Sequence, residues 1–125
     1  MGVRMSEVPK RENLTIEFKS DKKTLSDSVI IEEVVALSNT DGGSLYIGVE
    51  DDGTITGAQP THRETSRLAS LISGRTVPPV PARVELVDEA MPVVRVSVPK
   101  STAIVATSGG KILRRRLKLD GEPET

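Results

Sequence analysis

The 125-residue chain contains no cysteine, one histidine, and only two aromatic residues, Phe18 and Tyr46. The lack of cysteine excludes a disulfide scaffold, a thiolate zinc site and a cysteine nucleophile. With His62 as its one histidine, the chain is not expected to hold a histidine-rich metal site. The position of His62 favours a role at the start of a helix. No apolar run approaches the ~18 residues of a membrane helix, and the N-terminus lacks the apolar core of a signal peptide. These absences predict a cytoplasmic protein with an aliphatic core and no membrane partner.

The periodicity of apolar residues predicts an α+β domain with a mixed β-sheet and two helices, in the order β-α-β-β-α-β-β-β. The first helix is expected from the N-cap residue Ser26 to Asn39, and the second from Thr61, whose spacing to Glu64 is that of a capping box. Strands are expected at residues 14–19, 45–49, 54–57, 82–88, 92–98 and 111–119, with a weaker one at 104–105. In the first strand, Phe18 is expected to face the core, and Glu17 the other side.

One domain is expected, because domains commonly contain ~100–150 residues. Residues 1–11 are predicted to be a flexible N-terminal arm, residues 12–120 the domain, and residues 121–125 a C-terminal tail. The formal net charge of −1 contrasts with the strongly basic balance of many nucleic-acid-binding domains. The charges are nevertheless segregated along the chain, so a local basic surface is still expected.

Residues 39–53 carry the most informative pattern, Asn-Thr-Asp-Gly-Gly-Ser-Leu-Tyr-Ile-Gly-Val-Glu-Asp-Asp-Gly. Gly42 and Gly43 permit positive φ and close backbone approach where the first helix is expected to end. Three consecutive acids, residues 50–52, follow the predicted buried strand, where they are placed to bind metal or polar ligands. A purely structural turn needs neither feature in this density.

This pattern, preceded by Glu17-Phe18-Lys19 and an amphipathic helix, resembles the signature of the Schlafen AlbA-type DNA-binding domain family. The resemblance extends over roughly residues 12–119. It implies a nucleic-acid-binding (DNA or RNA) module like the N-terminal domains of prokaryotic transcriptional regulators. Animal Schlafens carry two such lobes around a basic groove, so a homodimer of this single lobe is expected by analogy.

Binding is predicted to be led by phosphate contacts, and therefore to be salt-sensitive and weakly sequence-specific, because two aromatic residues cannot form an extended stacking platform. The candidate phosphate-binding turn consists of Asn39, Thr40, Gly42 and Gly43, with a simple helix stop as the structural alternative. The candidate nucleic-acid-binding cations are Lys19, Lys22, Lys23, Lys111, Arg114, Arg115 and Arg116. In an alternating strand, Arg115 would point away from its two arginine neighbours, and edge protection is the alternative role of all three.

The resemblance also implies an alternative function, because animal Schlafens are metal-dependent ribonucleases. It places the catalytic and metal-binding carboxylates at Glu12, Glu17 and Asp51, with the acids beside Asp51 as alternatives. Clustered carboxylates hold Mg²⁺ or Mn²⁺, which polarise a phosphate and activate water. The structural alternatives are a surface acid for Glu12, an ion pair with Lys19 or a nearby arginine for Glu17, and a solvated turn for Asp51.

Two phosphate-binding fingerprints are absent from the sequence, Gly-x-x-x-x-Gly-Lys-Ser/Thr and Gly-x-Gly-x-x-Gly. An ATPase therefore has no support at the level of motifs. A domain that senses ATP or another nucleotide through the glycine turn is the third hypothesis. The sequence favours a binding module without a required cofactor over the endoribonuclease, and both over the nucleotide sensor.

Overall fold

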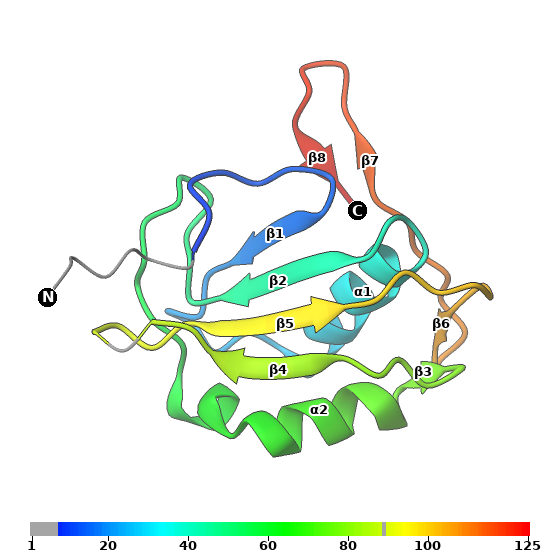
Figure 1. The fold of residues 1–125 in the computed structure, drawn as a ribbon, viewed down its shortest axis with the longest axis horizontal. Coiled ribbons are helices and arrows are strands. Elements are labelled where there is room, and N and C mark those ends of the chain that lie inside the picture. Colours follow the sequence, from blue (N-terminus) through cyan, green and yellow to red (C-terminus); the bar gives the residue numbers. More distant parts are fainter. Residues whose placement is uncertain (1–7, 89) are drawn as a thin grey trace, which may run out of the picture.

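The computed structural model describes residues 8–88 and 90–125 and shows an α+β fold with a mixed sheet and two α-helices (Figure 1). The predicted fold class is therefore confirmed. The helices are α1 (Asp27–Ser38) and α2 (Thr65–Gly74), and a 3₁₀ helix covers Pro60–Arg63. The strands are β1 (Ile16–Lys19), β2 (Gly43–Ile47), β3 (Thr76–Val77), β4 (Arg83–Leu86), β5 (Val94–Val98), β6 (Ala106–Thr107), β7 (Arg116–Leu117) and β8 (Pro123–Glu124).

The central sheet has the strand order β1-β2-β5-β4. Strands β1 and β2 are parallel, which requires a crossover connection, and α1 supplies it. The pairs β2–β5 and β5–β4 are antiparallel. Two smaller ribbons, β3–β6 and β7–β8, lie outside this sheet, and Figure 1 shows the β7–β8 hairpin projecting from its β1 side.

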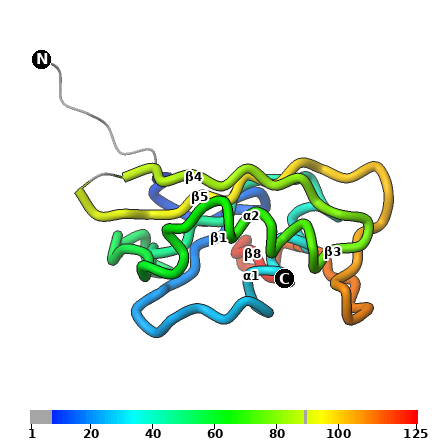
Figure 2. Tube along the Cα trace, turned by 90° about the horizontal axis from the view of Figure 1, so that it is seen from below, coloured from blue at the N-terminus to red at the C-terminus, as the bar shows by residue number. Residues whose placement is uncertain are grey.

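Both helices cover the same face of the sheet (Figure 2), and the main core lies between the helices and the sheet. Helix α1 begins where it was predicted, because the Ser26 side chain accepts a hydrogen bond from the N–H of Val29 at 3.2 Å. The main core is aliphatic and includes Ile30, Val34, Leu37, Leu45, Ile47, Leu68, Ile72, Val94 and Val96. None of the described helices is long and apolar enough to span a membrane.

The opposite face of the sheet carries a smaller cluster around the two aromatic residues. Phe18 and Tyr46 pack edge to face with ring centroids 6.1 Å apart, and both rings are buried. Val8 packs partly buried against this cluster, so residue 8 of the predicted arm lies on the domain, whereas residues 1–7 lie outside the described residues. With both rings buried, the domain offers no aromatic surface on which a base could stack.

The facing of β1 differs from the prediction. Glu17 lies beside Leu45 in the register, and Leu45 belongs to the main core, so Glu17 points toward the helix-covered face. Phe18 points to the small aromatic cluster on the other side. The two side chains point to opposite faces, as predicted. Both faces of the sheet are covered, however, and Glu17 lies on the face beneath α1.

The second helix begins later than predicted, and the capping box does not form. Thr61 lies in the 3₁₀ helix, and its hydroxyl accepts a hydrogen bond from Arg67 at 3.1 Å. Glu64, with φ −79° and ψ 80°, is outside the helical region, so the chain cannot continue as one helix from Thr61 into α2.

The long final strand predicted at residues 111–119 is reduced to Arg116–Leu117. Its earlier residues give their backbone bonds to the end of α1: Leu113 accepts from Asn39, and Arg115 donates to Thr40. The return strand predicted at 54–57 is likewise reduced to one bridge, between Val49 and Ile55. In both places, side-chain or turn contacts replace the expected ladder.

Candidate functional site

The turn after α1 fixes a distant part of the chain. The amide of Asn39 donates to the carbonyls of Val105 and Leu113 at 2.8 and 3.0 Å, and its oxygen accepts from the N–H of Val105 at 2.8 Å. The hydroxyl of Thr40 donates to the Ala36 carbonyl and accepts from the N–H of Arg115, both at 2.9 Å. These contacts hold residues 105–115 against the end of α1.

The glycine pair is required by backbone packing. Gly42 has φ 72°, and its N–H donates to the carbonyl of Leu37 at 2.7 Å, which ends the helix. Gly43 has φ 141°, and a Cβ at this position would lie 2.1 Å from the carbonyl oxygen of Thr15. The helix-stop alternative thus accounts for Gly42, and the close approach of Thr15, the residue before β1, accounts for Gly43.

A polar hollow of about 400 Å³ lies beside this turn, and we call it the basic hollow. Its charged residues are Lys100, Arg114 and Asp41; Lys100 and Asp41 are 3.7 Å apart, and both side chains are more than half exposed. Arg114 is exposed and forms no ion pair within the described ranges 8–88 and 90–125. The complete lining is Asn39, Thr40, Asp41, Lys100, Ser101, Thr102, Ala103, Ile104 and Arg114.

Arg115, the next residue, is placed in the opposite way. Its guanidinium is fully buried and donates to the Glu17 carboxylate and, at 2.8 and 2.7 Å, to the carbonyls of Leu14 and Asn13. The carboxylate of Glu33 on α1 lies 3.6 Å from the same guanidinium. Arg115 therefore joins the residues around the edge strand β1 to helix α1.

Lys19 completes an ion cluster with these three side chains, Glu17, Glu33 and Arg115. Its ammonium lies 3.5 Å from Glu17 and 3.6 Å from Glu33. Burial alone would lower the pKa of Lys19, but Glu33 and Glu17 outweigh it, and the pKa is raised. Burial raises the pKa of Glu33, and the nearby Glu17 charge adds to the effect. The predicted ion pairs of Glu17 with Lys19 and with an arginine are both present.

Glu12 lies along the outer edge of β1. Its carboxylate accepts the N–H of Phe18 at 2.8 Å. The pKa of Glu12 is raised to about 7, mainly by burial and in addition by the neighbouring charges of Glu17 and Asp51. The three carboxylates singled out in the sequence are therefore close enough to influence one another.

Their arrangement does not fit a metal centre as it stands. In the part of the chain that the structure describes, no three His, Asp or Glu side chains are grouped so that they could hold a metal ion. The Glu17 carboxylate is already occupied by Arg115 and Lys19. Asp51 lies exposed in the turn after β2.

The remaining predicted cations do not form one surface. Lys22 lies 3.9 Å from Glu50 near the ends of β1 and β2, and Lys23 follows it in the same loop. In Figure 1 the ends of β1 and β2 lie at the opposite end of the sheet from β6 and β7. Two more cations are paired with acids: Lys111 with Glu32 at 3.4 Å, and Arg116 with Glu124 at 2.6 Å.

Lys100 was not anticipated from the sequence. It lies two residues after the end of β5, and a Cβ on Gly42 would lie 2.7 Å from its backbone nitrogen. Recognising that β2 and β5 pair would have placed Lys100 beside the glycine turn. The buried pair of His62 and Asp21, 2.7 Å apart, was also not anticipated; Asp21 also accepts from the N–H of Gln59 at 2.6 Å, so the pair fastens the β1–α1 loop to the segment before α2.

Comparison with known proteins gives one family and a shared fold. The family model described as Schlafen, AlbA_2 matches residues 12–120. The DIP2311 protein of Corynebacterium diphtheriae has a TM-score of 0.63 and 18% identity over 89% of this chain, which spans only 22% of that protein chain. The N-terminal domain of a RecG-related protein of Nitrosomonas europaea has a TM-score of 0.58 and 22% identity, over 82% of this chain and 79% of that domain. The search of curated proteins found no match.

Proposed function

The chain belongs to the Schlafen AlbA_2 family, and from this premise we propose that it is a nucleic-acid-binding module whose phosphate contacts are made in the basic hollow. The family points to a nucleic-acid-related domain. The similar Nitrosomonas europaea domain belongs to a protein named as related to the DNA helicase RecG, which also favours a nucleic-acid-related domain. The observation that carries the proposal is that the basic hollow joins the turn of Asn39 and Thr40 to Arg114 and Lys100.

The chemistry of the basic hollow suits a phosphodiester backbone. Arg114 offers a planar set of N–H donors without an ion-pair partner among the described residues, and Lys100 offers an ammonium whose exposed contact with Asp41 is weak. Hydroxyls of Ser101 and Thr102 add donors. Contacts of this kind orient a phosphate backbone and carry little sequence information, so binding is expected to be salt-sensitive and weakly specific.

The same reasoning ranks the other predicted cations. Arg115 has its guanidinium buried in the ion cluster, so we assign it a structural role. Lys22 lies 3.9 Å from Glu50, one of the acidic residues 50–52, which oppose the approach of a phosphate, and Lys23 is the next residue. We expect both lysines to contribute less than Arg114. The paired Lys111 and Arg116 are also expected to contribute less to backbone binding.

The test is fluorescence anisotropy with labelled RNA, single-stranded DNA and duplex DNA, at low and physiological salt, with EDTA present. Arg114→Ala and Lys100→Ala should each weaken binding and lower the slope of log K against log salt by roughly 1. Lys23→Ala is the matched control from the other end of the sheet and should change the slope by much less. Absence of binding at low salt, or an equal loss in Lys23→Ala, would overturn the proposal.

A homodimer forms part of the proposal because the projecting β7–β8 hairpin exposes two leucines, Leu117 in β7 and Leu119 in the connection. Pairing of two hairpins would cover these side chains and place two basic hollows on one nucleic acid, as expected for a regulator-like protein. Light scattering should then give twice the chain mass, and Leu117→Asp with Leu119→Asp should return it to the monomer value. A monomer at high concentration would remove the dimer from the proposal and leave the binding site.

A metal-dependent endoribonuclease is the second candidate, favoured by the position of Glu12. Its carboxylate is held against β1, and Glu17 and Asp51 act on its pKa. Because Glu17 is occupied by Arg115, this function would require Glu17 to exchange that partner. For this candidate, cleavage of RNA will require Mn²⁺ or Mg²⁺ and will be lost in Glu12→Gln, whereas Glu64→Gln, at an exposed acid before α2, will retain it. Cleavage that survives Glu12→Gln would contradict the assignment.

A further inference from the structure

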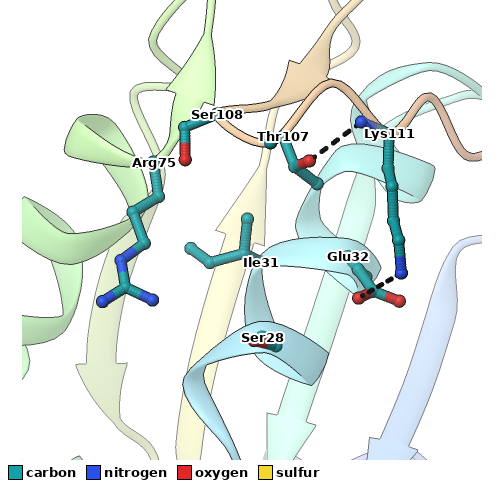
Figure 3. Close-up of a pocket in the computed structure, with 8 residues that line it drawn as sticks. Ser28, Ile31, Glu32, Arg75, Thr107, Ser108 and Lys111 are labelled. Atoms are coloured by element: carbon teal, nitrogen blue, oxygen red, sulfur yellow. Dashed lines mark hydrogen bonds and ion pairs between the residues drawn. The ribbon is translucent and has the colours of Figure 1, made fainter.

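A second hollow is lined by other residues of the segment that runs from Lys100 to Arg114. It has a volume of about 240 Å³ and lies between α1, the end of α2 and the turn after β6 (Figure 3). We call it the α1 pocket. Its lining residues are Ser28, Ile31, Glu32, Arg75, Thr107, Ser108, Gly109 and Lys111.

Two cations flank the α1 pocket from different elements. Figure 3 shows the side chains of Arg75 and Lys111 on opposite sides of Ile31, whose buried side chain belongs to the main core. Arg75 follows α2, is exposed and forms no ion pair with any residue the structure describes. Lys111 approaches the carboxylate of Glu32 at 3.4 Å, but its side chain is 67% exposed, so this contact is weak.

The backbones of both cations are held by one turn. The carbonyl of Arg75 accepts from the N–H of Ser108 at 2.9 Å. The carbonyl of Lys111 accepts from the N–H of Thr107 at 2.8 Å, and the N–H of Lys111 donates to the Thr107 hydroxyl at 3.0 Å. The two side chains therefore start from backbone positions that are fixed by the same turn.

The pocket is rich in donors. The hydroxyls of Ser28 and Ser108 form no hydrogen bond within the described parts of the chain, and they add to the donors of Arg75 and Lys111. Glu32 is the single carboxylate. A ligand with several acceptor oxygens and about two negative charges satisfies this set, because it can draw Lys111 away from Glu32 and still contact Arg75.

We propose that the α1 pocket binds a phosphate monoester group, with its oxygens between Arg75 and Lys111 and its carbon substituent against Ile31. A monoester carries about −1.5 to −2 charges at neutral pH, whereas a backbone phosphodiester carries one and would leave Lys111 with Glu32. The volume lies below the ~300–1,000 Å³ of typical small-molecule sites, which suits an end group. Two sources share this chemistry: the phosphorylated end of a nucleic acid, which rests on the proposed function, and a free nucleotide, which does not.

The first experiment compares two single-stranded oligonucleotides of one sequence, one with a 5′-phosphate and one with a 5′-hydroxyl, by fluorescence anisotropy. The 5′-phosphate form should bind about tenfold more tightly, the equivalent of one charge-assisted contact set. Arg75→Ala and Lys111→Ala should each abolish most of this preference while the 5′-hydroxyl form loses much less affinity. Arg83→Ala, an exposed arginine on β4 that does not line the pocket, is the control.

Glu32→Gln gives a change of opposite sign. Removing the carboxylate frees Lys111 and removes repulsion, so the preference for the 5′-phosphate form should increase. A residue that only shaped the pocket would not improve binding when neutralised. An unchanged or smaller preference in Glu32→Gln would contradict the role assigned to Lys111.

A second arm uses a free ligand, so that the inference can be judged apart from nucleic-acid binding. In ¹⁵N-labelled protein, adenosine monophosphate should shift the amide signals of Ser28, Ser108 and Gly109, and adenosine should not. If neither oligonucleotide binds but the monophosphate shifts these signals, the proposed function fails and the pocket is a nucleotide site. If both oligonucleotides bind equally and the monophosphate shifts nothing, the inference is overturned while the basic hollow stands.

Discussion

Two adjacent arginines lie in opposite environments, one in the basic hollow and the other in the ion cluster. Arg114 is exposed at the basic hollow and has no ion-pair partner in the described chain. Arg115 is fully buried, contacts the carboxylates of Glu17 and Glu33, and donates to backbone carbonyls before β1. Arg114 can therefore contact a ligand, whereas the adjacent Arg115 stabilises the fold. A run of basic residues is therefore not by itself a binding surface, because successive side chains in extended chain point in opposite directions.

The largest effect is expected from removing the buried member of this pair. Arg115→Met leaves Glu17 and Glu33 without their buried partner, and breaking a buried ion pair in this way costs about 3–5 kcal/mol. Urea denaturation should show this loss in the free energy of unfolding. Arg114→Met, on the exposed side, should change it by less than about 0.5 kcal/mol.

A double-mutant cycle distinguishes the loss of the Arg115–Glu17 ion pair from a general folding defect. Glu17→Gln combined with Arg115→Met should be less destabilised than the sum of the single variants, because the charge that Glu17 would carry without Arg115 is gone. Additive losses would contradict the ion cluster as a coupled unit.

The next largest effect is expected at the glycine turn beside the basic hollow. In Gly43→Ala the new Cβ would lie 2.1 Å from the Thr15 carbonyl at a φ of 141°, so β1 and the turn must separate. Backbone strain of this kind costs of order 1–3 kcal/mol, and the thermal midpoint should fall accordingly. Gly74→Ala is the control: nothing lies within 4 Å of its Cβ, and the helix should be unchanged or slightly stabilised. A tolerated Gly43→Ala would mean that close packing does not require this glycine.

The sequence was sufficient for the fold because its strongest signals are local. Ser26 caps α1 as its side-chain chemistry predicts, and Gly42 ends the helical turn as expected. The prediction was wrong where a distant contact replaced a local one. Residues 111–119 were predicted as one strand, but Asn39 and Thr40 form hydrogen bonds with the backbone of Leu113 and Arg115, and only Arg116–Leu117 is a strand.

The candidate site was less predictable, because it depends on which strands are neighbours. Lys100 is close to Gly42 only because β5 pairs with β2. Glu17 meets Arg115 across 98 residues of sequence, and no spacing rule anticipates such a contact. The Glu12, Glu17 and Asp51 roles, like the phosphate contacts, stay predictions that the experiments above decide.

A smaller effect is expected from the carboxylates around β1, which should make the stability of the protein depend on pH, unlike the basic hollow. The pKa of Glu12 is raised from 4.5 to about 7, so the folded protein binds more protons than the unfolded chain between these values. The stabilising contribution is present below pH 4.5 and is lost as the pH rises through about 7. After allowance for solvent screening, this loss is on the order of 1 kcal/mol.

Thermal unfolding between pH 5 and 8 checks this sign. The midpoint of the wild-type protein should fall as Glu12 ionises, and Glu12→Gln should flatten that part of the curve. Glu50→Gln is the control, because a hydrogen bond from Thr56 lowers the pKa of Glu50, so this carboxyl group is ionised in both states from pH 5 to 8 and contributes no slope there. A wild-type midpoint that rises across this range with the same slope in Glu12→Gln would show that Glu12 does not titrate as described.

The smallest effect is expected at Arg116, the third arginine of the run. Its nitrogen lies 2.6 Å from the Glu124 carboxylate, yet its side chain is 77% exposed. Exposed pairs contribute about 0–1 kcal/mol, so geometry alone overstates this one. Arg116→Ala should therefore change the free energy of unfolding in urea by less than about 0.5 kcal/mol and weaken nucleic-acid binding less than Arg114→Ala does. A loss of binding as large as that of Arg114→Ala would extend the binding surface from the basic hollow onto the β7–β8 hairpin. Of the three arginines, only Arg115 would then have a purely structural role.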